Sequence, residues 1–292
     1  MDILKQIAAS QFAQVWANAH SQLKKTVAQQ DFEKQSQDVQ LRLRSLEQAQ
    51  LVDARLIEFS SVGGQSAQVA CGSVDPKAPN YLQVQVVPGS LRQAVALVEL
   101  PHEPMRYVAS LQLAEEAGVF KLAGLTMNPS SYKGKAAKDY AQSAEDMLGQ
   151  HKLLSAYVDS ATAALLARLG PTLHSSQEIQ LNARYAEIEK NQELKPELTS
   201  WQVKGTDYQI VRIGLTSTLD DLVPTVLYLS HQKLSENPIT VEATSMMEYV
   251  RGKYPELGLQ FVAVLFQAYN EIPSDPNHTY AYYRVPIFFQ PQ

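Results

Sequence analysis

The residue types that could carry out chemistry in this chain form few recognisable motifs. The sequence has no G-x-x-x-x-G-K-[ST] loop, no G-x-G-x-x-G, no G-x-S-x-G and no H-E-x-x-H. Ser130 to Lys133 matches the S-x-x-K spacing of serine acyl-enzymes, but Ser21 to Lys24 matches it equally well. The supporting S-D-N and K-T-G elements are absent. We therefore interpret Ser130 to Lys133 as a helix start with solvated lysines, and we assign no catalytic residue.

The sequence also contains no pattern that indicates a metal site or a reactive thiol. The histidines lie at no ligand spacing: His20, His102, His151, His174, His231 and His278. We therefore expect no metal site, and no motif indicates a cofactor. The single cysteine, Cys71, excludes an intramolecular disulfide and a cysteine-based zinc site. No His or Lys lies near it in sequence to lower its pKa, so we expect a buried, unreactive thiol.

The most informative bias of the chain is aromatic. Ten of the fourteen tyrosines follow residue 150. If residues 279–289 form a strand, Tyr280 and Tyr282 face the same way. Cross-strand packing with hydroxyl groups at the rim explains such a cluster. The alternative is a groove for a sugar, a peptide or a partner surface, with four contact residues: Tyr269, Asn270, Tyr280 and Tyr282.

Length and composition indicate a folded protein without strong charge bias. A chain of 292 residues with 45% hydrophobic and 19% charged residues predicts two globular domains. A net charge of −5 argues against nucleic-acid binding through phosphate neutralisation. No run of 18 apolar residues predicts a transmembrane helix, and the N-terminus lacks the plan of a signal peptide. We expect a cytoplasmic protein, or an exported or periplasmic one if a leader has been removed.

The first half reads as helices followed by an antiparallel meander. Apolar residues recur at helical spacing over residues 3–29, and a more polar helix is expected over 32–50. The period then changes to two over residues 51–62, 66–74, 81–87, 92–100, 106–114 and 119–127. Gly63-Gly64 predicts a tight turn between the first two of these strands. One face of the sheet must be covered, and the leading helix is the available cover.

The hairpin YVASLQLAEEAGVFKLAGLTM, residues 107–127, resembles the closing hairpin of the nuclear transport factor 2-like superfamily, with Phe120 where an aromatic residue often lies. The element order over residues 3–128 is similar as well. The resemblance implies a cystatin-like α+β cone, a fold that hosts enzymes, binding modules and assembly domains. Enzymes of that superfamily place an acid or a His–Asp pair inside the cone. Asp53, His102 and Tyr107 are isolated candidates and form no such pair.

The second half begins with a long helical pattern over residues 133–170, in which Gly149 marks a break. Ser175 and Glu178 form a capping box for a helix over 176–193. Strands are expected over 199–204, 207–215, 222–232, 259–269 and 279–289. Asn237 should cap an inserted helix over 238–252. The expected organisation is a module over 1–130, a connecting helix over 131–150 and a second module over 151–292.

We therefore predict an α+β fold of two modules, each with leading helices packed on a mostly antiparallel sheet. Three functional hypotheses follow. The first is a non-enzymatic binding or assembly protein whose partner is an unknown protein or small ligand. The second is a small-molecule hydrolase or isomerase, which needs a perturbed carboxylate or His inside the first-half cone. The third is a homodimer organised through the long helix. The absent catalytic motifs and the aromatic final hairpin favour the first.

Overall fold

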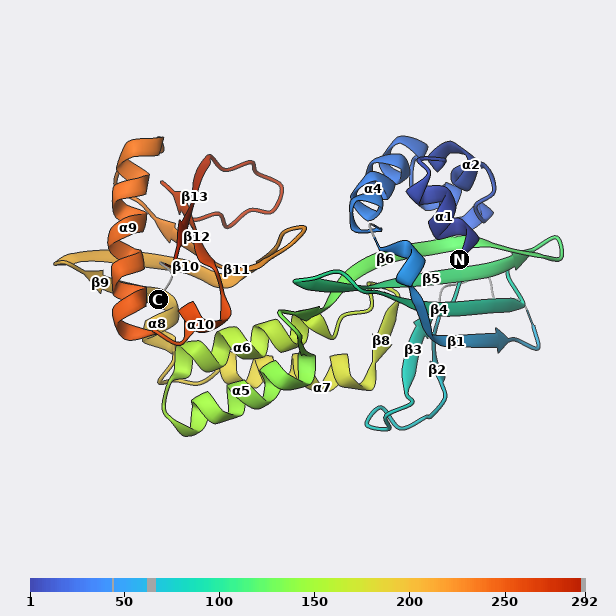
Figure 1. Cartoon of the computed structure of the whole chain (residues 1–292), viewed down its shortest axis with the longest axis horizontal. Helices are drawn as coiled ribbons and strands as arrows, with labels where there is room; N and C mark the ends of the chain where they lie inside the picture. The colour runs from blue at the N-terminus through green and yellow to red at the C-terminus, as the bar shows by residue number, and fades with distance from the viewer. Residues whose placement is uncertain (44, 62–66, 290–292) are drawn as a thin grey trace. The chain divides into compact units, whose positions relative to one another are not determined.

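The computed structural model describes residues 1–43, 45–61 and 67–289. In these residues the chain forms ten α-helices and thirteen strands in three sheets, and the predicted α+β class is confirmed (Figure 1). The chain divides into two compact units. Unit 1 comprises Met1–Ala137 and Leu165–Leu181, and unit 2 comprises Lys138–Ala164 and Asn182–Gln292. Each unit combines two separate segments of the chain, whereas each expected module was one continuous range; Leu165–Leu181, for example, belongs to unit 1.

Unit 1 is built on an antiparallel sheet in the order β1-β4-β5-β6-β7. Its strands are β1 (Gln50–Glu58), β4 (Arg92–Leu100), β5 (Met105–Glu116), β6 (Val119–Tyr132) and β7 (Lys135–Ala136). A second sheet joins β2 (Gln68–Cys71), β3 (Leu82–Gln85) and β8 (Leu173–Ser175). The expected hairpin of residues 51–62 with 66–74 is wrong, because β1 pairs with β4 and β2 with β3. Its Gly63-Gly64 turn lies outside the described residues.

The N-terminal segment forms several short helices: α1 (Asp2–Ala8), α2 (Phe12–Ala17), α3 (Ser21–Thr26) and α4 (Gln29–Arg42). In Figure 1, α1, α2 and α4 lie over one face of the large sheet. The expected single helix over 3–29 is wrong. Ser10 has a φ of 59°, and His20 is the N-cap of α3 rather than a helical residue. The apolar stripe nevertheless marked the buried side, since Leu4, Ile7 and Val15 are buried.

The other face of the large sheet packs against the small sheet. Ile57, Val95 and Leu97 of β1 and β4 form one apolar cluster with Leu82, Val84 and Leu173 of β3 and β8. Cys71 packs against this cluster and is half-buried. The expected full burial of Cys71 is therefore wrong. Partial burial still raises the pKa of its thiol, although Arg55 acts in the opposite direction.

Unit 2 has a five-stranded sheet in the order β13-β12-β11-β10-β9. The strands are β9 (Ser200–Val203), β10 (Thr206–Ser217), β11 (Leu222–Leu229), β12 (Ala263–Tyr269) and β13 (Tyr282–Phe288). β11 and β12 are parallel and the other pairings are antiparallel. The crossover between β11 and β12 contains α9 (Glu236–Lys253), whose N-cap is Ser235. The predicted cap Asn237 is therefore wrong, and it lies in the first turn with Pro238.

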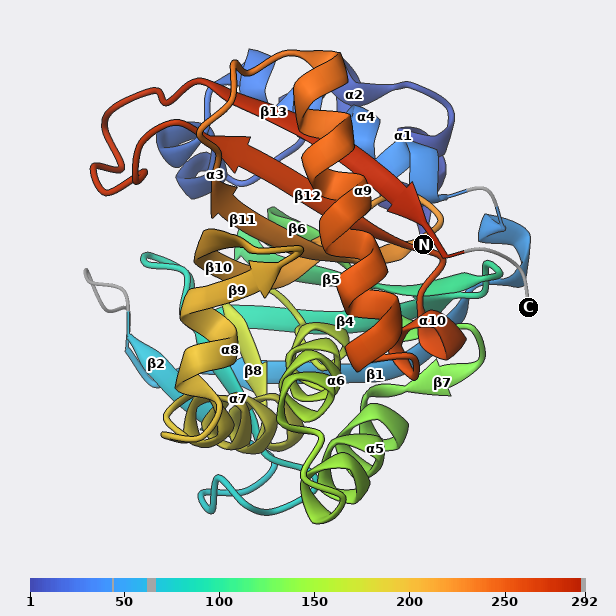
Figure 2. The same cartoon turned by 90° about the vertical axis from the view of Figure 1, so that its left-hand side faces the viewer.

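The long helical pattern over residues 133–170 forms two helices that are separated after Gly149, as predicted. α5 (Ala137–Gly149) ends at Gly149, His151 adopts a φ of 58°, and α6 (Leu153–Leu166) follows. Ser175 caps α7 (Ser176–Glu189), because its Oγ accepts a hydrogen bond from the Glu178 N–H at 3.1 Å. Two short helices, α8 (Lys195–Thr199) and α10 (Leu257–Gln260), complete unit 2 (Figure 2). Throughout the described ranges, the helices lack the combined length and apolarity that crossing a bilayer requires.

Candidate functional site

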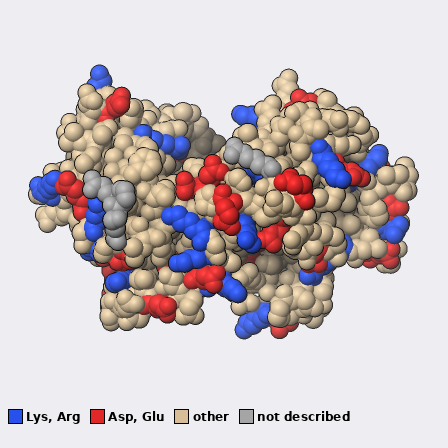
Figure 3. Space-filling view, viewed as in Figure 1, with Lys and Arg blue, Asp and Glu red and all other residues tan. Residues whose placement is uncertain are grey.

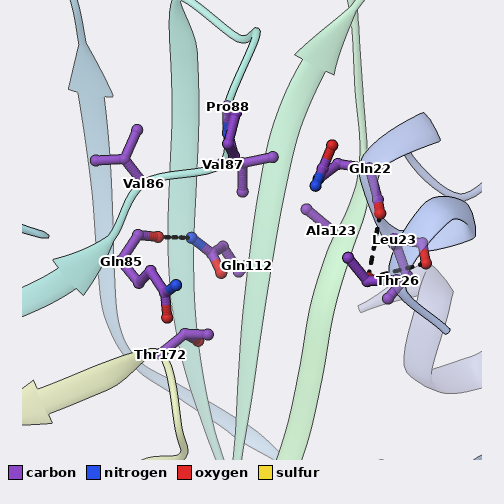
Figure 4. Close-up of a pocket in the computed structure, with 10 residues that line it drawn as sticks. All are labelled: Gln22, Leu23, Thr26, Gln85, Val86, Val87, Pro88, Gln112, Ala123 and Thr172. Carbon is purple, nitrogen blue, oxygen red and sulfur yellow. Dashed lines mark hydrogen bonds between the residues drawn. The ribbon is translucent and has the colours of Figure 1, made fainter. Parts of the chain in front are cut away.

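Unit 1 contains an open cavity of about 330 Å³ beside α3 and the end of β3 (Figure 4). Its described lining consists of side chains from five segments of the unit: Gln22, Leu23 and Thr26 of α3, Gln85 to Pro88, Gln112 of β5, Ala123 of β6, and Thr172. All ten residues are apolar or carry a neutral amide or hydroxyl group. A charged ligand would therefore find no counter-charge in this lining, and desolvating it there would be costly.

One wall of the cavity is held by a buried amide. Gln93 of β4 is fully buried, and its Oε1 accepts a hydrogen bond from the Val87 N–H at 2.9 Å. Its Nε2 donates to the Val87 carbonyl at 2.7 Å. The side chain thus pairs with Val87 as a neighbouring strand would, although β3 has already ended at Gln85. This clamp fixes Val86, Val87 and Pro88 as the wall.

The floor of the cavity is formed by β5 and β6. Gln112 is only 4% exposed, and its Nε2 donates to the Gln85 carbonyl at 2.5 Å. In Figure 4 the Gln112 side chain lies between the Gln85–Pro88 segment and Ala123. Gln85 N–H in turn donates to the Thr172 carbonyl at 2.8 Å. The Gln112 side-chain amide and the Gln85 backbone amide therefore connect β5, β3 and the segment before β8 around the cavity.

The opposite wall, α3, is attached to the β5–β6 hairpin at its first residues. The His20 N–H donates to the Leu122 carbonyl at 2.8 Å, and His20 Nδ1 accepts from the Gln22 N–H at 3.1 Å. Burial lowers the pKa of His20, which favours the neutral ring that this acceptor role requires. Glu116 accepts from the Ser21 N–H at 3.3 Å and from Lys121 Nζ at 2.7 Å. Mainly through Lys121, the pKa of Glu116 falls to about 2.

The tyrosines singled out in the sequence are only partly brought together in unit 2. Tyr269 and Tyr282 are opposite each other on β12 and β13, with ring centroids 5.9 Å apart. Tyr269 is buried, whereas Tyr282 is 50% exposed. The guanidinium of Arg284 lies 4.8 Å from the centroid of the Tyr282 ring. These two tyrosines therefore form a cross-strand pair with one exposed member.

The other two members of that group have local roles. Asn270 Nδ2 donates to the carbonyls of Ser230 and Gln232, each at 2.9 Å. Tyr280 lies in the loop before β13, so the expected strand face shared with Tyr282 is wrong. The Tyr280 hydroxyl accepts from the Asp275 N–H at 2.9 Å, and its ring packs on His278.

The isolated candidates of the first half do not line the cavity. Asp53 pairs with Arg55 at 2.8 Å, and Tyr107 is fully buried beneath Arg42, 5.6 Å from its guanidinium. His102 lies in the connection between β4 and β5. The S-x-x-K match is not at a helix start, because Ser130 lies in β6, which ends at Tyr132, and Lys133 is in the following turn, with a φ of 50°.

Sequence reasoning missed Gln93 and Gln112, which shape the cavity. A signal was present in the alternation of the strands. Gln93 shares its side of β4 with Val95 and Leu97, which are buried in the apolar cluster. A polar residue at an inward position of an apolar alternation indicates a buried hydrogen-bonding role.

In the described ranges, no three His, Cys, Asp or Glu side chains gather as they would around a metal ion. Lysines, arginines and acidic residues are interspersed on the surface in Figure 3, without a broad basic patch on that face. Neither observation adds a charged-ligand site to the neutral cavity. Comparison of the chain with protein-family models, with curated proteins and with solved structures gave no match.

Proposed function

We propose that this is a non-enzymatic binding protein and that the cavity of unit 1 holds an uncharged small molecule. The observation that carries the proposal is the neutral lining of the cavity, which combines apolar side chains with amide and hydroxyl groups. Such a lining suits a ligand with an apolar body and a neutral hydrogen-bonding group, such as an amide or an alcohol. About 330 Å³ is within the usual range of small-molecule sites.

The same lining disfavours the hydrolase or isomerase hypothesis. General acid–base catalysis needs a titratable group within hydrogen-bond reach of the reacting atoms. None of the ten described lining residues offers one. The resemblance of residues 3–128 to the nuclear transport factor 2-like superfamily is part of the proposal. It draws support from helices packed on one face of an antiparallel sheet, with the cavity beside that sheet.

The test compares pairs of neutral and ionised probes of the same shape. We expect 4-phenylbutanamide to shift the methyl resonances of Leu23 and Ala123 in a saturable titration, and 4-phenylbutyrate to leave them unchanged. The carboxylate has to be desolvated without a counter-charge, whereas the amide exchanges its water for Gln and Thr partners. Methyl-resolved NMR of the full chain gives the measurement.

Two variants locate the binding. Ala123→Phe should fill the cavity and abolish the shifts caused by the amide, whereas Val119→Phe should leave them intact. Val119 is on the same strand, 59% exposed and outside the lining. Equal binding of the amide and the carboxylate, or amide binding that survives Ala123→Phe, would overturn the proposal.

The Tyr269–Tyr282 pair is a second proposed binding surface, for a protein partner. The half-exposed Tyr282 ring stacked beside Arg284 is the observation that favours it, because both residue types are enriched at interface hot spots. We expect Tyr282→Ala to abolish capture of a partner while the circular dichroism spectrum stays unchanged. A partner captured equally by that variant would dismiss the surface.

A further inference from the structure

The edge of the large sheet at β1 differs from the other sheet ends in the described chain. β1 has nine residues, and among the described strands it pairs only with β4 (Figure 1). At the other end of the same sheet β7 has two residues, and β9 at one end of the second sheet has four. β13, at the other end of that sheet, contains Pro286. Short strands and proline are usual ways of protecting an edge from another chain, and β1 has neither.

Four of the six exposed residues of β1 are apolar, and the other two are Gln50 and Glu58 at its ends. Leu51, Val52 and Leu56 are 62%, 51% and 55% exposed. Lysine, the common protective residue of an exposed edge, does not occur in this strand. An exposed strand edge combined with aliphatic side chains is a template for pairing with another strand.

The sequence of β1 is complementary to its own inverted copy. With a two-fold axis at Ala54, an antiparallel copy places Asp53 opposite Arg55 and Arg55 opposite Asp53. The same register places Leu56 opposite Val52. An axis at Asp53 or at Arg55 would instead place like charges opposite each other, which is destabilising.

Hydrogen bonds within one chain already hold the Asp53 and Arg55 side chains in place. Arg55 bonds to Asp53 Oδ2 and also donates to the carbonyls of Cys71 at 2.9 Å and Asn80 at 2.7 Å. Little side-chain entropy would therefore be lost when the pair meets its copy. The irregularity of the β1–β4 ladder falls at Val52, between Leu51 and Asp53, so the regular strand from Asp53 to Glu58 contains the pairs at Ala54 and between Asp53 and Arg55 but not Val52.

We propose that the protein forms a homodimer in which β1 pairs with β1 of a second copy, antiparallel, about an axis at Ala54. The two large sheets then continue into one another. Asp53 and Arg55 of both copies form a four-membered charge network, and Leu56 packs on Val52 of the second copy. This dimer differs from one organised through the α5–α6 region, because its contacts lie in unit 1 alone.

Cysteine cross-linking tests the register. At the axis the two Ala54 Cα atoms lie about 4.5–5.5 Å apart, within disulfide range. Leu56 lies two residues from the axis, so its Cα is about 13 Å from that of its copy. We expect Ala54→Cys to form a disulfide-linked dimer under mild oxidation, and Leu56→Cys and the wild-type chain, which carries only Cys71, to remain uncross-linked.

Light scattering tests the assembly without a cross-link. We expect the wild-type chain to show twice the 32.4 kDa mass of one chain and to dissociate on dilution. Leu56→Lys should weaken the dimer at least tenfold, whereas Val241→Lys, exposed on α9, should not.

Asp53→Arg should also weaken the dimer, and the double variant Asp53→Arg with Arg55→Asp should restore it. A monomeric mass for the wild type at its highest soluble concentration, or equal cross-linking of Ala54→Cys and Leu56→Cys, overturns the proposal.

Discussion

The interior of unit 2 and the cavity of unit 1 are built with different buried polar groups. Unit 2 buries three carboxylates beside hydroxyl or amide donors: Asp159, Glu242 and Glu256. Glu242 Oε2 accepts from Ser230 Oγ at 2.6 Å and from the Tyr228 hydroxyl at 3.1 Å. Around its cavity, unit 1 instead uses the neutral amides of Gln93 and Gln112. Unit 1 also buries a carboxylate, Glu178, but it lies outside the cavity lining.

The buried carboxylates of unit 2 and the buried amides of unit 1 have different capacities to accept a ligand. A buried carboxylate oxygen that accepts hydrogen bonds from donors of its own unit has little acceptor capacity left for a ligand. Asp159 Oδ2 is held in this way, because it accepts from Ser143 Oγ at 2.5 Å and from Gln260 Nε2 at 3.1 Å. A neutral amide costs less to leave beside an open space, since water or a ligand can replace a partner. Donors in the interior of unit 2 therefore hold its carboxylates, whereas the amides of unit 1 border the cavity.

Removing Glu242 should have the largest effect on stability. Glu242→Ala leaves the buried hydroxyls of Tyr228 and Ser230 without their acceptor, and we expect the free energy of unfolding of unit 2 to fall by about 3 kcal/mol. Each unit contains one of the two tryptophans, Trp16 and Trp201. Urea unfolding followed by Trp201 fluorescence in a Trp16→Phe background measures the change in unit 2.

A matched variant on the same helix is the control for that prediction. Glu248 is on α9 and forms an exposed ion pair with Lys204 at 2.5 Å. We expect Glu248→Ala to change the free energy of unfolding by less than about 0.5 kcal/mol. If the two variants are equally stable, Glu242 has no special role in the interior of unit 2.

Removing the Gln93 amide should have a smaller effect on stability and a specific effect on the cavity. Gln93→Leu leaves the Val87 N–H and carbonyl without their partners, at a cost of about 2 kcal/mol in unit 1. The wall over residues 86–88 should loosen, and binding of the neutral probe should weaken. Trp16 fluorescence in a Trp201→Phe background reports the unfolding of unit 1.

The control here is a glutamine with an exposed hydrogen bond. Gln83 Nε2 donates to Gln68 Oε1 at 2.9 Å on the exposed side of the small sheet. Gln83→Leu should change both the stability and the binding little. Loss of binding with Gln83→Leu but not with Gln93→Leu would contradict the role given to the amide clamp.

Local patterns predicted elements well where the period was sustained. Burial alternates over residues 92–97, and residues 92–100 form β4 with the expected bounds. Gly149 marked the break between α5 and α6, and Ser175 marked the cap of α7. The helical stripe over 3–29 misled because its spacing continues across Ser10 and His20, where the backbone leaves the helix. A periodic pattern reports which side is buried, not whether the helix is continuous.

The sequence could not predict the candidate site for a different reason. Its lining comes from five segments, and Gln22, Gln85 and Gln112 belong to no motif. Strand pairing also depends on long-range packing, as the wrong hairpin of residues 51–62 with 66–74 illustrates. The tyrosine cluster was visible as a bias of composition, yet only Tyr269 and Tyr282 meet, because β13 begins after Tyr280.

The smallest expected effect concerns the attachment of α3 to the wall of the cavity. Because the pKa of Glu116 is lowered to about 2, its ionised form stabilises unit 1 at pH values above its ordinary 4.5. This contribution is lost as the pH falls from about 4.5 to about 2. The side chain is 31% exposed, so screening limits the contribution to about 0.5 kcal/mol.

Glu116→Gln should therefore be less stable than the wild type at neutral pH and equally stable at pH 2, and added salt should shrink the difference. Trp16 fluorescence during urea unfolding across this range gives the measurement. Glu103→Gln is the control, because Glu103 is 63% exposed and lies 3.5 Å from Arg106. A difference for Glu116→Gln that is constant with pH would mean that the loss is not electrostatic. The charge at Glu116 would then have no part in holding α3, and the cavity wall formed by α3 would not depend on this carboxylate.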